Sequence, residues 1–292
     1  VYTSFTMRLV TFCKGDKVLR VGALRNEKKD VVDLSSTWSS MRSFITEGEP
    51  ALEAASKMVK EATDTHALAD VVIKAPIYDP EKIVCIGLNY KDHAAESGMT
   101  IPETPVFFAK YPPSIIGPNE TIILPPESKE VDYEVEMVIV IGKKGRRIKK
   151  EDAMNHVLGY TVGHDVSARD LQLGGAKQWV KGKCWETFAP IGPAIVTKDL
   201  IPDIHKCRIW CSLNGKMMQD SNTDQLAFNV PELVSYLSGV MTLTPGDLIF
   251  TGTPPGVGFA RKPPVFLKEG DSVTVGIEGL GELTNNVKDE QL

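Results

Sequence analysis

Two glutamates separated by one residue are the first feature of this sequence that could carry chemistry. Glu134 and Glu136 lie in residues 131–141, a stretch whose second half is apolar and which predicts a β-strand. Side chains alternate along a strand, so both carboxylates should lie on one face, about 7 Å apart along the backbone. Because Val138 and Val140 continue that face, the acids enter a core, where a divalent cation with oxygen ligands would keep them ionised. The alternative is an edge strand whose charges face water.

A third acid, Asp165, lies where a second predicted strand ends. Ser167 and Asp170 follow with the spacing of a helix-capping box, which predicts that a helix begins there. Arg169 and Gln172 are three residues apart, so they should lie on one side of that helix and could reach the oxygen atoms of a ligand. Taken singly, each is also typical of an ordinary surface residue.

His93 and Glu96 form a second candidate pair, three residues apart in a predicted short helix. This spacing would let Glu96 accept a hydrogen bond from the imidazole and make His93 a better base. A surface ion pair is the alternative. The chain has five histidines, and none lies in an H-x-H or H-E-x-x-H pattern, which argues against a histidine-rich metal site.

Lys183 and the loop at residues 251–258 complete the set of candidate residues. Lys183 lies between a glycine and bulky residues, so a partly buried lysine could balance the acids and polarise a substrate oxygen. The loop reads T-G-T-P-P-G-V-G and lacks the Lys-Ser/Thr ending of a nucleotide-binding loop. The amides of Gly252 and Thr253, with the Thr253 hydroxyl, could instead hold a carboxylate. A solvated lysine and a plain turn are the alternatives.

These residues must be positioned by a mostly β protein of the α+β class. Residues 1–78 predict a small N-terminal α/β domain, with strands at 8–12, 18–21 and 30–34 and helices at 40–46 and 50–63. Residues 79–292 contain short β runs separated by Gly and Pro, with a helix at 231–240. This second domain is predicted to be a barrel or folded sandwich with few helices.

The composition of the chain is that of an ordinary globular protein. Of its 292 residues, 42% are hydrophobic and 24% are charged, and the net charge of −5 argues against nucleic acid or an anionic membrane as partner. A basic run at residues 143–150 is predicted to be a solvated turn. Five cysteines without a C-x-x-C pair predict reduced thiols in an intracellular compartment. Residues 1–6 precede the first predicted strand and are expected to be the remnant of a processed leader or an artificial extension.

Five motifs in order resemble the fumarylacetoacetate hydrolase family, and the resemblance extends over residues 83–287. The motifs are N-Y-x-x-H-x-x-E at 89–96, D-Y-E-x-E at 132–136, H-D-V-S-A-R-D-x-Q at 164–172, G-K-x-x-[DE]-T-F-x-P-x-G-P at 182–193 and T-G-T-P-x-G-V-G at 251–258. Two departures concern substrate fit near Lys183. Leu171 stands where relatives often have Trp, and residues 184–186 read Cys-Trp-Glu instead of the usual Ser/Thr-Phe-Asp.

The resemblance implies a site, a fold and an assembly. It implies Mg²⁺, with Mn²⁺ or Ca²⁺ as alternatives, held by Glu134, Glu136 and Asp165. It implies a mobile lid that carries His93 and Glu96, and a substrate near Lys183, Arg169, Gln172, Gly252 and Thr253. It also implies the family's mixed β-sandwich roll, a homodimer built through the C-terminal domain, and a mitochondrial location, with the cytoplasm as the alternative.

The resemblance further implies a small 2-oxo or 2,4-dioxo acid as substrate, oxaloacetate before acylpyruvates. Members of the family hydrolyse C–C bonds of acylpyruvates, decarboxylate oxaloacetate or interconvert keto and enol forms. These reactions share an enolate, whose negative charge a divalent cation stabilises. We expect a keto–enol tautomerase or a C–C bond hydrolase. The alternatives are an oxaloacetate decarboxylase, a non-catalytic metal-dependent binding protein and a pseudoenzyme kept as an assembly partner.

Overall fold

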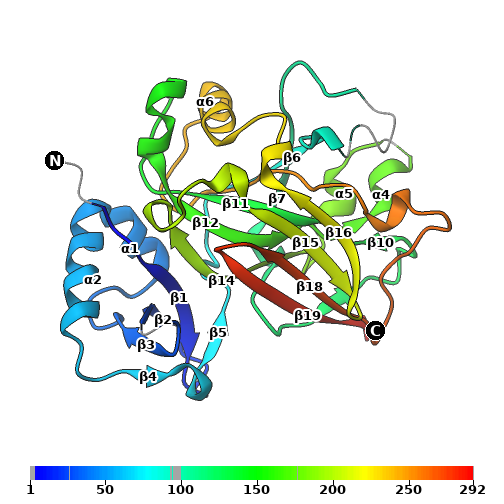
Figure 1. Cartoon of the computed structure of the whole chain (residues 1–292). Coiled ribbons are helices and arrows are strands. Elements are labelled where there is room, and N and C mark those ends of the chain that lie inside the picture. Colours follow the sequence, from blue (N-terminus) through cyan, green and yellow to red (C-terminus); the bar gives the residue numbers. More distant parts are fainter. Residues whose placement is uncertain (1–3, 26, 93, 95–99, 176, 292) are drawn as a thin grey trace.

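The fold is known from a computed structural model, which describes residues 4–25, 27–92, 94, 100–175 and 177–291 (Figure 1). The N-terminal strands are β1 (Arg8–Cys13), β2 (Arg20–Arg25), β3 (Asp30–Asp33), β4 (His66–Ala67) and β5 (Val72–Lys74). The later strands are β6 (Ile83–Gly87), β7 (Val106–Lys110), β8 (Ile115–Ile116), β9 (Ile122–Leu124), β10 (Val131–Asp132), β11 (Val135–Ile141), β12 (Val157–His164), β13 (Ser167–Ala168), β14 (Ala189–Thr197), β15 (Arg208–Leu213), β16 (Lys216–Asn222), β17 (Leu248–Phe250), β18 (Ser272–Ile277) and β19 (Gly281–Asp289).

Helices are few and short. The α-helices are α1 (Met41–Glu47), α2 (Glu49–Glu61), α4 (Arg169–Leu173), α5 (Val180–Lys183) and α6 (Val230–Val240). The 3₁₀ helices include η2 (Pro112–Ser114), η3 (Lys150–His156) and η5 (Ile204–Lys206). Within the described ranges, every helix is too short or too polar to cross a membrane.

Most strands belong to two sheets. The larger sheet has the order β4-β3-β2-β1-β14-β12-β11-β17-β6-β7, with β5 added beside β1 and β8 beside β14. The second sheet has the order β16-β15-β18-β19-β9, and β10 and β13 form a separate pair. Figure 1 shows β15, β16, β18 and β19 lying across β11 and β12. The predicted mostly β fold with few helices is therefore confirmed.

The two faces of β11 point into two different cores. Val135, Met137 and Ile139 belong to the main core, which includes residues of the second sheet such as Val275 and Leu283. Val138 and Val140 lie in the other core, together with β17, β6 and the N-terminal segment. Since side chains alternate along a strand, Glu136 shares the face of Val138 and Val140. The prediction that this acid points along a buried face is confirmed, because only 1% of Glu136 is exposed.

The N-terminal segment contributes strands to the larger sheet. Strand β1 pairs with β14 in antiparallel register, with Leu9 opposite Ile195, so residues from both predicted domains share one sheet. Helices α1 and α2 cover this end of the molecule (Figure 1). The division at residues 78 and 79 stays a prediction. The strand predicted at 18–21 was placed too early, because the structure begins it at Arg20.

Candidate metal centre and active site

A break in the chain between β10 and β11 builds the acidic site. The predicted single strand over residues 131–141 was wrong, because Tyr133 and Glu134 lie between two strands with different partners: β10 pairs with β13, and β11 pairs with β12. At the break, the Asp165 amide donates a hydrogen bond of 2.9 Å to the Glu134 carbonyl oxygen. This bond holds the segment that carries Asp165 beside the segment that carries Glu134.

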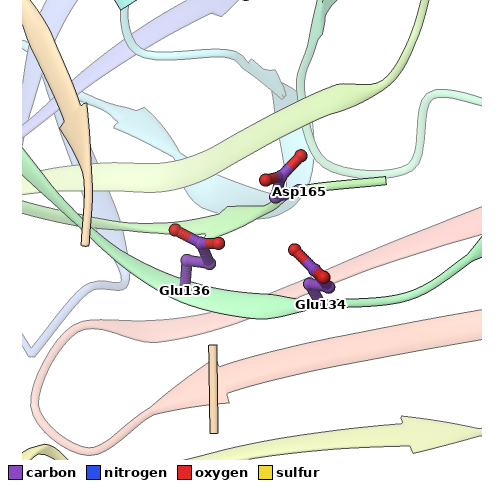
Figure 2. A group of neighbouring side chains, drawn as sticks. All are labelled: Glu134, Glu136 and Asp165. Carbon is purple, nitrogen blue, oxygen red and sulfur yellow. The ribbon is translucent and has the colours of Figure 1, made fainter. Parts of the chain in front are cut away.

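The three predicted metal ligands converge on one point. One oxygen atom from each of Glu134, Glu136 and Asp165 lies within 4.8 Å of the other two. Figure 2 shows the three carboxylates gathered close together on neighbouring segments of the chain. Three points this close enclose a centre about 2.8 Å or less from each, and divalent cations take oxygen ligands at about 2.0–2.6 Å. The geometry therefore fits a cation after a contraction of at most about 0.8 Å.

The acids are buried, and two of them are paired with buried cations. Glu134, Glu136 and Asp165 are 7%, 1% and 0% exposed. Lys183 Nζ donates to Glu134 Oε2 and to Asp165 Oδ2, at 2.9 Å in both cases. Arg169 Nη2 donates to the other Glu134 oxygen at 2.6 Å. Burial without a partner would be unfavourable for each charge, so these contacts keep Glu134 and Asp165 available as carboxylates.

The pKa values of Glu134, Glu136 and Lys183 reflect these surroundings. Burial works to raise the pKa of Glu134, but Lys183 and Arg169 outweigh it and hold that pKa below its ordinary value. Burial and the charges of Asp165 and Glu134 raise the pKa of Glu136 well above its ordinary value. Burial works to lower the pKa of Lys183, but Asp165 and Glu134 raise it overall. Without a cation, the raised pKa of Glu136 therefore favours the protonated form of that carboxyl group.

The loop after β17 contacts the acids through its backbone. The Gly252 amide donates to Glu136 Oε2 at 2.8 Å, so this loop does hold a carboxylate, and that carboxylate belongs to the protein. The Thr253 hydroxyl donates to the Val135 carbonyl oxygen at 2.8 Å and accepts from Gln219 Nε2 at 2.8 Å. Gly252 and Thr253 thus line the site from the side of Glu136, and their contact with substrate stays a prediction.

Helix α4 presents Arg169 and Gln172 to the site, although it begins differently from the prediction. The expected capping box at Ser167 was wrong, because α4 follows Ala168 and has no side-chain cap. The Ser167 hydroxyl donates instead to the Asp165 carbonyl oxygen, since residues 167 and 168 form strand β13. Arg169 Nη1 donates to Gln172 Oε1 at 3.1 Å, so the predicted neighbours do meet on one side of the helix.

His93 and Glu96 lie outside the described residues, but the chain leading to them is anchored at the site. Asn89 Nδ2 donates to the Thr251 carbonyl oxygen at 2.8 Å, and Asn89 Oδ1 accepts from the Phe228 amide. This asparagine therefore fixes the start of the N-Y-x-x-H-x-x-E motif beside the loop that carries Gly252. The roles of His93 and Glu96 stay predictions.

Sequence reasoning missed three residues that organise the site. Asp132, which is fully buried, accepts from Arg169 Nε at 2.8 Å and from the Gly258 amide at 2.7 Å. Gln219 links β16 to the site through Thr253, and Lys110 approaches Asp165 from β7. The signal for Asp132 was present in the D-Y-E-x-E motif. A lysine that ends an apolar run was the only signal for Lys110.

Comparison with known proteins defines the class to which the chain belongs. The sequence model of the fumarylacetoacetate (FAA) hydrolase C-terminal domain matches residues 82–288. The chain is a member of the fumarylacetoacetate hydrolase family, which confirms the resemblance drawn from the motifs, and its fold is that of the family.

Three similar proteins show how far this membership extends. The mitochondrial oxaloacetate tautomerase Fahd2a of Rattus norvegicus is 50% identical over 248 residues, which cover 85% of this chain and 79% of that protein. The fumarylacetoacetate hydrolase domain-containing protein 2 homolog of Dictyostelium discoideum is 47% identical over 302 residues and 97% of each chain. The crystal structure of maleylpyruvate hydrolase from Sphingobium sp. SYK-6, with manganese(II) and pyruvate, matches with a TM-score of 0.82 and 29% identity over 98% of this chain and all of that one.

Proposed function

We propose that this chain is a divalent-cation-dependent oxaloacetate tautomerase. The observation that carries the proposal is the convergence of Glu134, Glu136 and Asp165 within 4.8 Å, in a buried site that Lys183 also enters. Buried oxygen ligands of this kind favour Mg²⁺ or Mn²⁺ over Zn²⁺. The name of the rat relative supports oxaloacetate as substrate, and the manganese in the maleylpyruvate hydrolase structure supports a divalent cation.

The three acids would hold the cation, and the cation would supply a Lewis acid that polarises a keto oxygen and stabilises the enolate charge. Lys183 is held beside that centre by Glu134 and Asp165, and its raised pKa keeps it a cation at neutral pH. Its ammonium can therefore attract a carboxylate or an enolate oxygen of the substrate.

A proton must leave carbon C3 of the keto form, and a proton must reach the C2 oxygen, for the enol to form. His93 is proposed to accept the proton from carbon and to pass it to the C2 oxygen, with Glu96 orienting its imidazole, so that no net proton is gained or lost. The anchoring of Asn89 to the Thr251 carbonyl oxygen supports this role, because it places a residue four positions before His93 beside the site. Arg169, Gln172, Gly252 and Thr253 are proposed to orient the substrate's carboxylates.

The test measures the rate of keto–enol exchange of oxaloacetate from the ultraviolet absorbance of the enol. The rate is measured with Mg²⁺ or Mn²⁺ and again with excess chelator. We expect the purified chain to accelerate the exchange only when the cation is present. NMR of the products in the same reactions distinguishes isomerisation from loss of CO₂. Exchange at the uncatalysed rate with either cation contradicts the proposal.

A second candidate reaction is hydrolysis of the C–C bond of an acylpyruvate. The similarity to maleylpyruvate hydrolase favours it, because that protein shares the fold over nearly the whole chain. This reaction additionally needs a water molecule activated beside the enolate-forming site. Release of pyruvate from an acylpyruvate, detected by NMR, would support hydrolysis, and its absence together with rapid oxaloacetate exchange would support the tautomerase.

The assembly and location are proposed to be a homodimer in mitochondria. The location is supported by the word mitochondrial in the name of the rat relative, with the cytoplasm as the alternative. The dimer is supported by β7, an edge strand of the large sheet on which Val106 and Phe107 are 38% and 37% exposed. Exposed apolar edge strands favour pairing with another chain. A monomer mass by light scattering at micromolar concentrations would contradict the dimer.

A further inference from the structure

A lysine that no motif singled out lies buried beside the metal ligands. Lys110 is the last residue of β7, and its side chain is fully buried. Its Nζ lies 2.7 Å from Asp165 Oδ1. It is not paired with Glu134 or Glu136 by any contact among the described residues, so its direct effect on the acids is exerted through Asp165.

The hydrogen bonds of Lys110 go to the backbone. Nζ donates to the carbonyl oxygens of Val166 at 3.1 Å, Lys183 at 2.6 Å and Phe188 at 2.7 Å. An ammonium group has three N–H donors, so these three acceptors use all of them. The contact between Lys110 Nζ and Asp165 Oδ1 is therefore an ion pair without a hydrogen bond.

This arrangement gives the two oxygens of Asp165 different surroundings. Oδ2 accepts a hydrogen bond from Lys183 Nζ at 2.9 Å. Oδ1 is buried and receives no hydrogen bond from any residue that the structure describes, although Lys110 Nζ lies close to it. Buried oxygens are rarely left in this state, because the loss of hydration is unfavourable. A cation at the site would satisfy Oδ1.

The three carbonyl groups come from segments that must stay in register for the site to exist. Val166 follows the ligand Asp165, Lys183 is the lysine that bonds two ligands, and Phe188 precedes β14. One buried ammonium group thus ties the backbone of Val166, next to the ligand Asp165, to the backbone of Lys183.

We propose that Lys110 is a positioning residue for the metal centre, which fixes Asp165 and Lys183 relative to each other through their backbones. This inference rests on the proposed function, because it concerns the same cation site. A simple counter-charge role predicts the opposite result, since removal of a positive charge near a cation site should strengthen cation binding. Loss of a positioning partner should weaken binding, as replacement of groups that orient metal ligands does.

The experiment compares Lys110→Met with the unchanged chain by titrating each cation-free protein with Mn²⁺ and measuring free Mn²⁺ by electron paramagnetic resonance. We expect Mn²⁺ binding about 10–100-fold weaker in the variant. We also expect turnover to need correspondingly more Mn²⁺ but to approach the unchanged maximum once Mn²⁺ saturates. Lys82→Met is the matched control, because Lys82 pairs with the buried Asp247 at 3.0 Å, away from the acids. It should lose stability and keep Mn²⁺ affinity.

Circular dichroism must show that the variants are folded. If Lys110→Met does not fold, Lys110→Gln carries the test, since its amide keeps two N–H donors without the charge, and the same weakening is expected. Unchanged or tighter Mn²⁺ binding in a folded variant overturns the proposal while leaving the proposed function intact. Failure of the unchanged chain to bind Mn²⁺ overturns the proposed function, and this inference with it.

Discussion

Replacement of Glu136 by glutamine tests the metal centre most directly. Glutamine has nearly the same shape, and its side-chain oxygen can still accept the 2.8 Å hydrogen bond from the Gly252 amide. The substitution therefore removes one negative charge and leaves the packing of a residue that is only 1% exposed. A loss of cation binding in Glu136→Gln would then report the charge, not a collapse of the site.

The magnitude follows from the distance between the carboxylate and the centre of the site. The centre lies about 2.8 Å or less from a carboxylate oxygen. A divalent cation within about 4 Å of a unit charge is stabilised by about 2 kcal/mol or more even at the dielectric constant of water, and by still more in a buried site. A loss of about 2 kcal/mol corresponds to about thirtyfold in affinity, which is the minimum that we expect. The raised pKa of Glu136 means that the unchanged chain must release a proton to bind a cation, so the difference should be smaller at pH 6 than at pH 8.

The assay is a Mn²⁺ titration of both proteins at pH 8 and pH 6, with circular dichroism to verify the fold. Asp247→Asn is the matched control, because Asp247 is a buried carboxylate that pairs with Lys82 and lies outside the site. It should lower the melting temperature and keep the Mn²⁺ affinity. If Glu136→Gln binds Mn²⁺ as tightly as the unchanged chain at pH 8, Glu136 is not a ligand and the reasoning from the three acids is wrong.

Three further predictions concern the lid, the pH dependence of stability and the packing of the sheet. His93→Ala should lower turnover about 10²-fold or more with little change in Mn²⁺ affinity. Turnover near the original rate would mean that His93 and Glu96 form only a surface contact. Burial lowers the pKa of His205, whose Nε2 accepts a hydrogen bond from the Val230 amide at 3.2 Å. As the pH falls below about 6.5, the unfolded chain therefore binds a proton at this histidine before the folded chain does, and the free energy of unfolding decreases. In urea melts at pH 5 to 7, His205→Asn should reduce the dependence of the free energy of unfolding on pH. An unchanged dependence would contradict this role of His205. Gly159→Ala should destabilise the fold by about 2 kcal/mol or more in the same melts, because the new Cβ would lie 2.0 Å from the Val196 carbonyl oxygen, and a stable variant would show that β12 and β14 can separate.

The acids of the site could be predicted because their signal is local. Glu134 and Glu136 are two residues apart, and the apolar residues after them indicate burial, so residue type and spacing suffice. Asp165 could be added because a strand ends there. The exact path of the chain could not be predicted, since the break at Tyr133 and Glu134 results from a change of strand partner. Pairing between distant strands leaves little trace in the residues on either side of such a break.

The groups that pair with the acids could be predicted only in part, because their contacts join distant parts of the chain. Arg169 is 37 residues from Asp132 in sequence, and Lys110 lies on a strand that precedes both. Lys183 could be predicted because it lies between a glycine and bulky residues, which suggested a partly buried lysine, whereas Lys110 ends an ordinary strand and resembles many surface lysines. Its burial depends on three carbonyl groups that meet only in the folded chain.

The charges of the site explain why a divalent cation suits it. The buried acids at the site are Asp132, Glu134, Glu136 and Asp165, and the buried cations are Lys110, Arg169 and Lys183. When all are ionised, the acids exceed the cations by one charge. That excess agrees with the raised pKa of Glu136, since one retained proton makes the set neutral. A divalent cation that replaces this proton leaves the site with one positive charge, which favours an anionic substrate such as oxaloacetate over a neutral one. Lys110, Arg169 and Lys183 thus do more than neutralise buried acids. Without them, the four acids and the bound divalent ion would carry a net negative charge, which would not attract a carboxylate.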